Sequence, residues 1–393
     1  MQRSEQSIRT SHVGMLPGGA QSHSGSSQGA AKPAEDMAAL TSRVAGIVKR
    51  QRDLGIDCVG DGEFWTGRHF RFYGQQLSGI TSRELRPGER ASGRESTRER
   101  DAFPKLYADM DRVGTAFCVP GEQPRFFPAK DKMVVTEPIK CRATDAIQRE
   151  IKVFKEALAA VGGVEEAFIC VYAPGWLDHF IYDEYYNDDE KFVFALADAM
   201  REEYRAVVDA GFILQIDDPG VVDWWDMLKP ALSVEAYRDR FAKLRIDAVN
   251  HAIAGLPADR IRYHLCWGSW HGPHTHDLPF EHVIGLMLQV NAQCYSFEAA
   301  NVRHEHEWRL WERTRLPDGK IILPGVVSHS TNLVEHPELI ADRIVRFARC
   351  VGRENVLAGT DCGLGGRVHA EIAWAKLGAL VEGARLASKR LWR

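Results

Sequence analysis

The feature that most limits the fold is an alternation of short apolar runs with longer helical patterns. The helical segments include residues 188–211, which end at Gly211, and residues 233–255, which begin at Ser233 and end at Gly255. This alternation is typical of a parallel β-sheet covered by helices, so we predict an α/β fold. The nine candidate strands are residues 8–14, 56–63, 132–139, 166–175, 212–219, 261–267, 294–298, 321–329 and 355–362.

Two observations favour a (β/α)8 barrel over an open sheet with a nucleotide crevice. No glycine-rich phosphate loop follows the first run, and the sequence GLGGR at 363–367 comes too late for a dinucleotide fingerprint. Polar side chains instead follow almost every run, and active sites of such barrels are built from the carboxyl ends of the strands. We predict a single TIM-like barrel domain over residues 1–393, in which one of the nine candidates is a short rim or loop segment.

Two stretches interrupt the alternation. Residues 18–31, GGAQSHSGSSQGAA, are small and polar, which is typical of an elaborated loop. Residues 81–103 are dense in charge and poor in core residues, and they open a charged insertion that we expect to extend to about residue 125. Such an excursion from the barrel fits a lid, an oligomer contact or a solvated surface, and a homo-oligomer is therefore an open alternative.

Charge and cysteine content exclude several classes of protein. The 50 basic and 54 acidic residues give a net charge of -4, without the basic excess typical of nucleic-acid binding. No signal-peptide core or apolar run of membrane-spanning length is present, so we expect a cytoplasmic protein with no membrane partner. The eight cysteines are expected to be free thiols or metal ligands, and most of them, such as Cys170, look like small buried hydrophobic residues.

A candidate metal site begins in the sequence YHLC. His264 and Cys266 are two residues apart on a predicted strand, so both side chains point to the same face. Zinc usually takes four ligands from cysteine, histidine and carboxylate groups, and Glu298 and Cys362 end two other predicted strands. The alternative interpretation is a buried strand cysteine that stands beside an unrelated histidine.

Aromatic and histidine side chains gather in the predicted loops around the barrel mouth. Of the ten tryptophans, eight follow predicted strands, and they either pack these loops onto the rim or form an apolar pocket for a flat ring. A pterin, an aryl methyl ether or a hydrophobic epoxide would fit such a pocket. The substrate-binding candidates among them are Trp65, Trp176, Trp267 and Trp270. The histidines at 271, 274 and 276 are expected to line or cover the mouth.

The order of these motifs resembles a known family. The sequences GDGEF, LQIDDP, HLC, FE and TDCGLGGR follow one another as in the catalytic barrel of cobalamin-independent methionine synthase and its relatives, which include epoxyalkane:coenzyme M transferases. The resemblance begins at RTSHVGMLP and covers nearly the whole chain. It implies that zinc is bound by His264, Cys266, Glu298 and Cys362.

The same resemblance implies roles for further residues. Glu63 and Asp217 match acids that hold the amino group of homocysteine, and His329 matches a histidine that assists proton transfer. The family places a serine for the homocysteine carboxylate where this chain has Met15, which leaves homocysteine open as the substrate. His12, Met15 and Asp218 are also candidates for substrate binding.

The expected activity is that of a zinc-dependent S-alkyltransferase, most simply a methyltransferase. Zinc deprotonates a bound thiol and leaves the sulfur able to attack carbon. The expected partners are a small-molecule thiol and an alkyl donor, with a 5-methyltetrahydropteroyl folate as the candidate methyl donor. Three alternatives stay open: an epoxide ring-opening thiol transferase, a zinc hydrolase or lyase acting on an aromatic or ether substrate, and a non-enzymatic barrel with a structural zinc.

Overall fold

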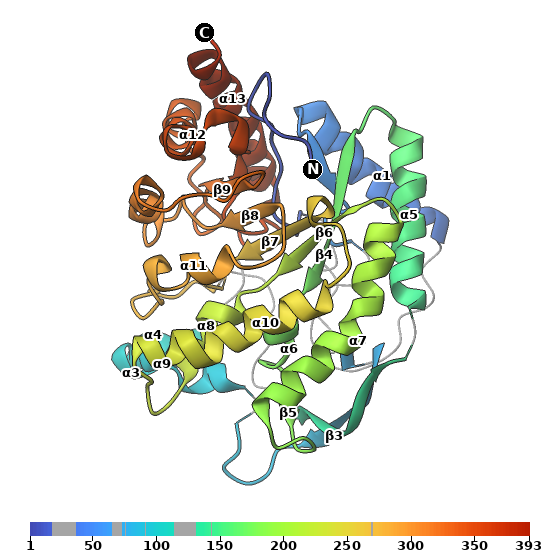
Figure 1. Cartoon of the computed structure of the whole chain (residues 1–393), viewed down its shortest axis with the longest axis vertical. Helices are drawn as coiled ribbons and strands as arrows, with labels where there is room; N and C mark the ends of the chain where they lie inside the picture. Colours follow the sequence, from blue (N-terminus) through green and yellow to red (C-terminus); the bar gives the residue numbers. More distant parts are fainter. Residues whose placement is uncertain are drawn as a thin grey trace.

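The computed structural model describes residues 1–17, 37–64, 73–74, 76–90, 92–113, 131–142, 144–268 and 270–393. Within these residues, the main element is a curled sheet of seven strands that neighbour one another in chain order (Figure 1). Every neighbouring pair is parallel, so the carboxyl ends of the strands meet at one edge. The strands are β1 (Cys58–Gly60), β4 (Glu166–Tyr172), β6 (Ile213–Asp217), β7 (Ile261–Leu265), β8 (Cys294–Phe297), β9 (Ile321–Val327) and β10 (Gly359–Thr360).

The first predicted strand joins the two edges of this sheet. Thr10 forms a parallel bridge with Ala358, and the backbone N–H of Ser11 donates to the Ala358 carbonyl at 3.0 Å. On its other side, the carbonyl of Thr10 accepts from the N–H of Cys58 at 3.1 Å. Residues 10–11 thus lie between β10 and β1 and occupy the place of a first barrel strand. The predicted α/β fold is confirmed, and the parallel sheet expected of the TIM-like barrel is present as a curled sheet.

A buried arginine fixes this first segment from the interior of the sheet. Arg262 of β7 is fully buried, and its guanidinium donates to Ser11 Oγ at 2.9 Å and to the His12 carbonyl at 3.2 Å. The same guanidinium lies 3.9 Å from the centre of the Phe168 ring. These contacts hold the short, irregular segment against the regular strands.

The surplus ninth strand candidate belongs to a second sheet. Residues 132–139 form most of β3 (Asp131–Cys141), which pairs antiparallel with β2 (Leu77–Glu84) and parallel with β5 (Ile181–Asp183). The expectation of a short rim or loop segment is therefore wrong, because the run forms an 11-residue strand with its own partners. Figure 1 shows this small sheet at the lower end of the molecule.

The longer helices cover the outside of the main sheet (Figure 1). The predicted helix 188–211 is α7, which begins after Asp188, whose carboxylate accepts from the Lys191 N–H, and is followed by Gly211 at a φ of 92°. The predicted helix 233–255 is interrupted by a π-helical turn at Tyr237–Ala242, between α9 (Val234–Ala236) and α10 (Lys243–Ala252). The long helices are α1 (Met37–Leu54), α5 (Asp145–Val161), α7 (Asp189–Asp209), α10 (Lys243–Ala252), α12 (Pro337–Val351) and α13 (Ala370–Leu391).

Shorter helices follow the strands at the carboxyl edge. α6 (Pro174–Leu177) follows β4 and α8 (Gly220–Met227) follows β6. The two helices approach closely because Gly220 has no side chain: a Cβ there would collide with the backbone of Gly175. α11 (Ile284–Met287) follows β7. The predicted charged insertion contributes α3 (Arg98–Ala102) and α4 (Pro104–Val113).

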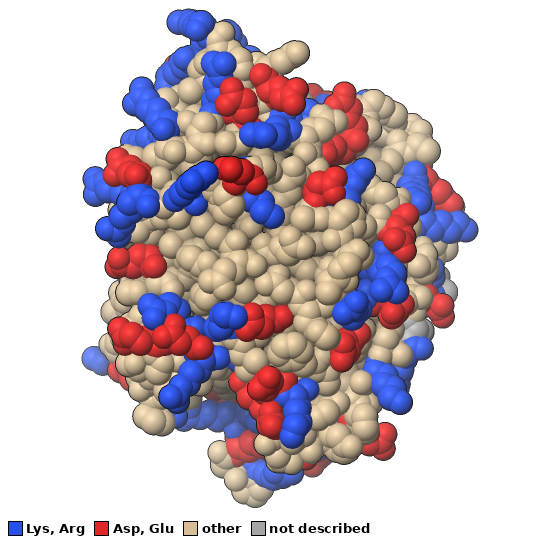
Figure 2. All heavy atoms as spheres, viewed as in Figure 1, with Lys and Arg blue, Asp and Glu red and all other residues tan. Residues whose placement is uncertain are grey.

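The surface carries both signs of charge. Figure 2 shows lysine and arginine side chains interspersed with aspartate and glutamate on the visible face, around a central area with few charged groups. Among the described residues, none of the helices combines the length and the hydropathy that a membrane crossing needs.

Candidate metal centre and active site

Three of the four predicted metal ligands come together at the carboxyl ends of β7 and β10. Candidate ligand atoms of His264, Cys266 and Cys362 all lie within 4.8 Å of one another. The Nδ1 of His264 pairs with the Ser296 hydroxyl of β8 at 3.1 Å, whereas the buried Nε2 has no hydrogen-bond partner among the described residues. One histidine, held through one ring nitrogen by a hydroxyl, together with two cysteine sulfur atoms is a donor set that zinc binds.

The two cysteines share a proton. The Cys266 thiol donates to the Cys362 sulfur, which holds the pKa of Cys362 well below its usual value and raises the pKa of Cys266. The neighbouring His264 lowers the pKa of Cys362 further. Deprotonation of both thiols would provide two sulfur ligands for a cation.

Glu298, the fourth predicted ligand, lies in a neighbouring group. Its carboxylate accepts from the Trp267 N–H at 2.9 Å and from Asn301 Nδ2 at 2.6 Å. It forms a second cluster with His329 and Asp361, whose candidate ligand atoms lie within 4.8 Å of one another. Burial is the main cause of the raised pKa of Glu298, and the charge of Asp361 raises this pKa further. The structure thus brings Glu298 beside the site, bound to the turn that follows Cys266.

Asp361 joins the loops after β8 and β10. Its Oδ1 accepts from the backbone N–H groups of Ala299 and Ala300 at 2.7 and 2.8 Å. The carboxylate passes over β9 at Gly325, where a Cβ would collide with it. Sequence reasoning gave Asp361 no role, although its place directly before Cys362 was a usable signal. The contact fixes the turn after Glu298 relative to the cysteine.

A third cluster lies next to the first. The Glu63 and Asp217 carboxylates and the Cys170 thiol offer ligand atoms within 4.8 Å of one another. Asp217 pairs in register with His264 on the neighbouring strand, and its Oδ1 accepts from Gln215 Nε2 at 2.6 Å. Burial raises the pKa of Asp217 to about 6. The structure thus brings together the two acids that the resemblance pairs, and it adds Cys170, which the sequence had indicated only as a small buried residue.

Backbone geometry aims Glu63 at this cluster. Its φ is 58°, in the left-handed region, and Asp61 Oδ1 accepts from its N–H at 3.0 Å. A Cβ on Gly14, which also has a positive φ, would collide with the Glu63 carboxylate. The glycine therefore leaves room for an acid to reach the sheet interior.

His329 follows β9 and is 5 % exposed. Its Nδ1 is buried without a hydrogen-bond partner among the described residues, and burial lowers its pKa to about 4. The imidazole is therefore neutral at physiological pH. In this neutral state it can act as a general base, and it can act as a general acid only after it has taken up a proton.

Of the three remaining substrate-binding candidates, two are fully buried and one is partly exposed. His12 is fully buried, its Nε2 pairs with Gln51 Oε1 at 2.8 Å, and burial lowers its pKa to about 3. Asp218 is fully buried, its Oδ2 accepts from the Tyr263 hydroxyl at 2.8 Å, and burial raises its pKa to about 7. Met15 is partly exposed, and its carbonyl accepts from the Gly365 N–H at 2.9 Å. Substrate contact by these three residues stays a prediction.

The predicted aromatic pocket is partly filled by the protein itself. Trp267 is 1 % exposed, and its ring stacks on His304 with centroids 4.0 Å apart. Trp270 stacks on His274 in the same way, and the Trp176 ring is tilted against that of His179 at 4.5 Å. The observed contacts give these rings a packing role, and contact with substrate stays a prediction. Trp65, like the polar stretch 18–31, lies outside the described residues.

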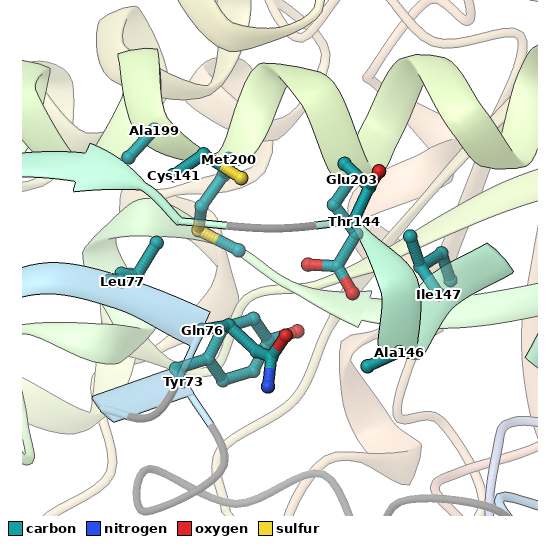
Figure 3. Close-up of a pocket in the computed structure, with 10 residues that line it drawn as sticks. All are labelled: Tyr73, Gln76, Leu77, Cys141, Thr144, Ala146, Ile147, Ala199, Met200 and Glu203. Atoms are coloured by element: carbon teal, nitrogen blue, oxygen red, sulfur yellow. The ribbon is translucent and has the colours of Figure 1, made fainter. Parts of the chain in front are cut away.

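A pocket beside the small sheet lies apart from these clusters (Figure 3). Figure 3 shows Ala199, Met200 and Glu203 of α7 above the pocket, Tyr73, Gln76 and Leu77 below it, and Ala146 and Ile147 of α5 at its right-hand side. None of the candidate ligands or acids lines it. One of its lining residues, Tyr73, accepts through its hydroxyl from the N–H of Tyr172 at the end of β4, at 3.3 Å. The three clusters at the strand ends therefore remain the candidate active site.

Comparison with known families identifies this arrangement. Residues 181–386, just over half of the chain, match the model of the cobalamin-independent synthase catalytic domain. The chain belongs to this family. The matched region contains the predicted metal ligands, Asp217 and His329, whereas Glu63 precedes it. This result confirms the family indicated by the sequence motifs.

Individual relatives agree with this assignment. The chain is 26% identical over 228 residues to methionine synthase of Saccharolobus solfataricus, a match that covers 57% of this chain and 59% of that protein. It is 24% identical over 241 residues to methionine synthase of Sulfurisphaera tokodaii, which covers 59% and 60%. The matches thus span less than two thirds of these relatives. Neither epoxide ring opening nor hydrolysis gains support from them.

Solved structures share the fold over nearly the whole chain. A B12-independent methionine synthase from Shewanella sp. W3-18-1, in complex with selenomethionine, superposes with a TM-score of 0.68 at 18% identity and covers 98% of this chain and 99% of that chain. A putative vitamin-B12 independent methionine synthase from Listeria monocytogenes gives 0.64 at 20% identity and covers 96% and 98%. At these identities the likeness establishes the fold.

Proposed function

We propose that this protein is a zinc-dependent S-methyltransferase that transfers a methyl group to a small-molecule thiol. The observation that carries the proposal is the convergence of a ring nitrogen of His264 with the sulfur atoms of Cys266 and Cys362 at the carboxyl ends of two strands. Two sulfur donors favour zinc over harder cations such as Mg²⁺. Membership of the cobalamin-independent synthase family supports the same assignment.

Zinc fits the donor set of this site. His264, Cys266 and Cys362 would hold it, with the carboxylate of Glu298, from the neighbouring cluster, as the candidate fourth ligand. Zinc bound there lowers the pKa of a coordinated substrate thiol, so that the thiol reacts as a thiolate at neutral pH. The Glu298 carboxylate already has donors in Trp267 and Asn301, so it keeps partners when it is not a ligand.

The acid cluster next to the metal site indicates the class of thiol. Glu63 and Asp217 offer two carboxylates beside the metal cluster, which suits a cationic amino group. We therefore propose an amino-bearing thiol of the homocysteine type as the acceptor and a methylated folate as the donor. The Met15 side chain carries no hydrogen-bond donor, so recognition of a carboxylate on the acceptor would fall to other groups.

The reaction moves one methyl group and one proton. The acceptor sulfur forms a bond to the methyl carbon while the bond between that carbon and the donor nitrogen breaks. His329 is neutral and buried with a nitrogen that lacks a partner among the described residues, so it can take the thiol proton and return it to the donor nitrogen. Its burial excludes water from this transfer.

Metal analysis and product analysis test the proposal together. We expect close to one equivalent of zinc in the purified protein, and a methylated thiol as product from an amino-bearing thiol and a methylated folate. Cys266→Ala and Cys362→Ala should lose most of the metal, whereas Cys350→Ala, a partly buried control in α12, should keep it. Zinc below about half an equivalent that both site variants leave unchanged would exclude the metal site.

A further inference from the structure

The charged insertion contacts the histidine-rich loop that follows the metal-site strand β7. Glu99 of α3 is 1 % exposed, and its Oε1 accepts from the backbone N–H of Thr275 at 2.6 Å. Its Oε2 accepts from the hydroxyl of Tyr107 on α4 at 2.5 Å. Burial and the Glu99 carboxylate raise the pKa of Tyr107, so the hydroxyl stays a donor. One buried carboxylate thus joins both insertion helices to the loop.

Trp270 is enclosed at the same contact. Its Nε1 donates to the Tyr107 hydroxyl at 3.1 Å. The ring stacks on His274, and the Arg94 guanidinium lies 4.6 Å from its centre. At Gly272 a Cβ would lie 2.7 Å from the Tyr107 hydroxyl oxygen, so a glycine lets the loop approach α4. The insertion therefore fixes the position of Trp270 as well as the loop backbone.

The loop begins at the candidate metal site. It follows Cys266 directly, and the N–H of Trp267 donates to Glu298. His274 pairs with Asp277 at 2.9 Å, and Asp277 also pairs with His304 at 3.1 Å, which fixes the far end of the loop. His271 hydrogen-bonds to the backbone of Arg367 in the loop after β10. The loop thus extends across the strand ends that carry the metal ligands.

The insertion keeps contacts with the barrel that do not involve this loop. Arg94 pairs with Asp223 of α8, and the Glu99 N–H donates to Asp226 Oδ1 at 3.1 Å. Loss of the Tyr107 hydroxyl would therefore leave the insertion docked and keep the bond between Glu99 and Thr275, but it would free Trp270 Nε1 and weaken the hold on the loop. This separation makes the role of the contact testable.

We propose that Glu99 and Tyr107 are positioning residues that hold residues 270–277 of the loop after β7 across the mouth of the metal site and so determine which methyl donors reach it. The proposal rests on the proposed function and adds a specificity element to it. A loop fixed by an insertion selects donors by shape, and its release weakens donor binding more than it slows the chemical step.

Tyr107→Phe in the zinc-loaded protein tests this proposal. The variant keeps the buried ring and removes the hydroxyl that links Glu99 to Trp270. We expect the KM for the methyl donor to rise about tenfold with kcat within about twofold, because the lost bonds act on binding. Hydrogen exchange at residues 267–277 and zinc removal by EDTA should each become at least about threefold faster. Asp109→Asn, which alters only an exposed ion pair with Arg112 in α4, should change none of these.

The outcomes separate this proposal from the proposed function. If Tyr107→Phe and Asp109→Asn give the same donor KM and the same rate of zinc removal, the loop is not held by this contact and the proposal is wrong. If the wild-type protein binds zinc but methylates no thiol, the proposed function fails, and the rates of exchange and of zinc removal still decide whether the insertion closes the site. Unchanged kcat with raised KM distinguishes positioning from a general loss of structure.

Discussion

Replacement of Asp361 by alanine should loosen the metal site without touching a metal ligand. One oxygen of this fully buried carboxylate accepts two backbone N–H groups, from Ala299 and Ala300. Alanine leaves both donors buried without a partner. Because these residues follow Glu298 directly, and Asp361 precedes Cys362, the change acts on two predicted ligands at once.

The magnitude follows from these contacts. A hydrogen bond to a charged group contributes about 1.5–3 kcal/mol, and two bonds to one oxygen are not fully additive. Burial raises the pKa of Asp361 to about 6, so desolvation of the carboxylate offsets part of the gain. We expect a loss of about 2–4 kcal/mol in the free energy of unfolding, which lowers the Tm of a chain this long by about 2–5 °C. Zinc affinity should fall about 10–100-fold, as for other groups that orient metal ligands.

Calorimetry and zinc competition with a chelator measure the two effects. Asp361→Asn is the matched control, because its amide oxygen can still accept both N–H groups, and it should lose less than half as much stability and affinity. Equal values for Asp361→Ala and Asp361→Asn would refute the reasoning, since the acceptor oxygen would then contribute nothing.

Three further predictions concern stability. Gly325→Ala should cost about 1–3 kcal/mol in thermal unfolding, because its Cβ would lie 2.6 Å from the Asp361 Cα; wild-type Tm would contradict this. Lys376 is fully buried and donates to Glu335 at 2.8 Å, so Lys376→Met should cost about 3–5 kcal/mol, and a Glu335→Gln background should reduce that cost; an equal cost in both backgrounds would exclude the coupling. The pKa of Asp218 is about 7 in the folded protein, above its ordinary value of 3.8, so ionisation of this buried group is unfavourable. The wild-type protein should therefore lose stability as the pH rises from about 4 to 7. Relative to wild type, Asp218→Asn should therefore gain about 2–4 kcal/mol between pH 4 and pH 8 in urea unfolding, and a flat difference would contradict the assignment.

Local sequence patterns predicted much of this architecture. Alternating runs located the strands of the main sheet, and the spacing of His264 and Cys266 identified one half of the metal cluster because alternate strand residues share a face. Cys362 could be assigned to the same metal cluster because parallel strands bring their carboxyl ends together.

The features that the sequence did not predict depend on contacts between distant segments. The run at 132–139 has the composition of a barrel strand, and only its pairing with β2 and β5 places it in a second sheet. Cys170 looks like any buried strand cysteine until Glu63 and Asp217 are seen beside it. The contact between Glu99 and Thr275 joins residues 176 positions apart, and no local pattern marks either partner.

X-ray absorption at the zinc edge tests the central claim most directly. The protein as purified should show two sulfur neighbours, from Cys266 and Cys362, with the remaining neighbours nitrogen or oxygen. Addition of an amino-bearing thiol such as homocysteine should add one sulfur neighbour, because the acceptor thiol binds the metal as a thiolate. A spectrum with no sulfur neighbours, or with two that the thiol leaves unchanged, would contradict the account.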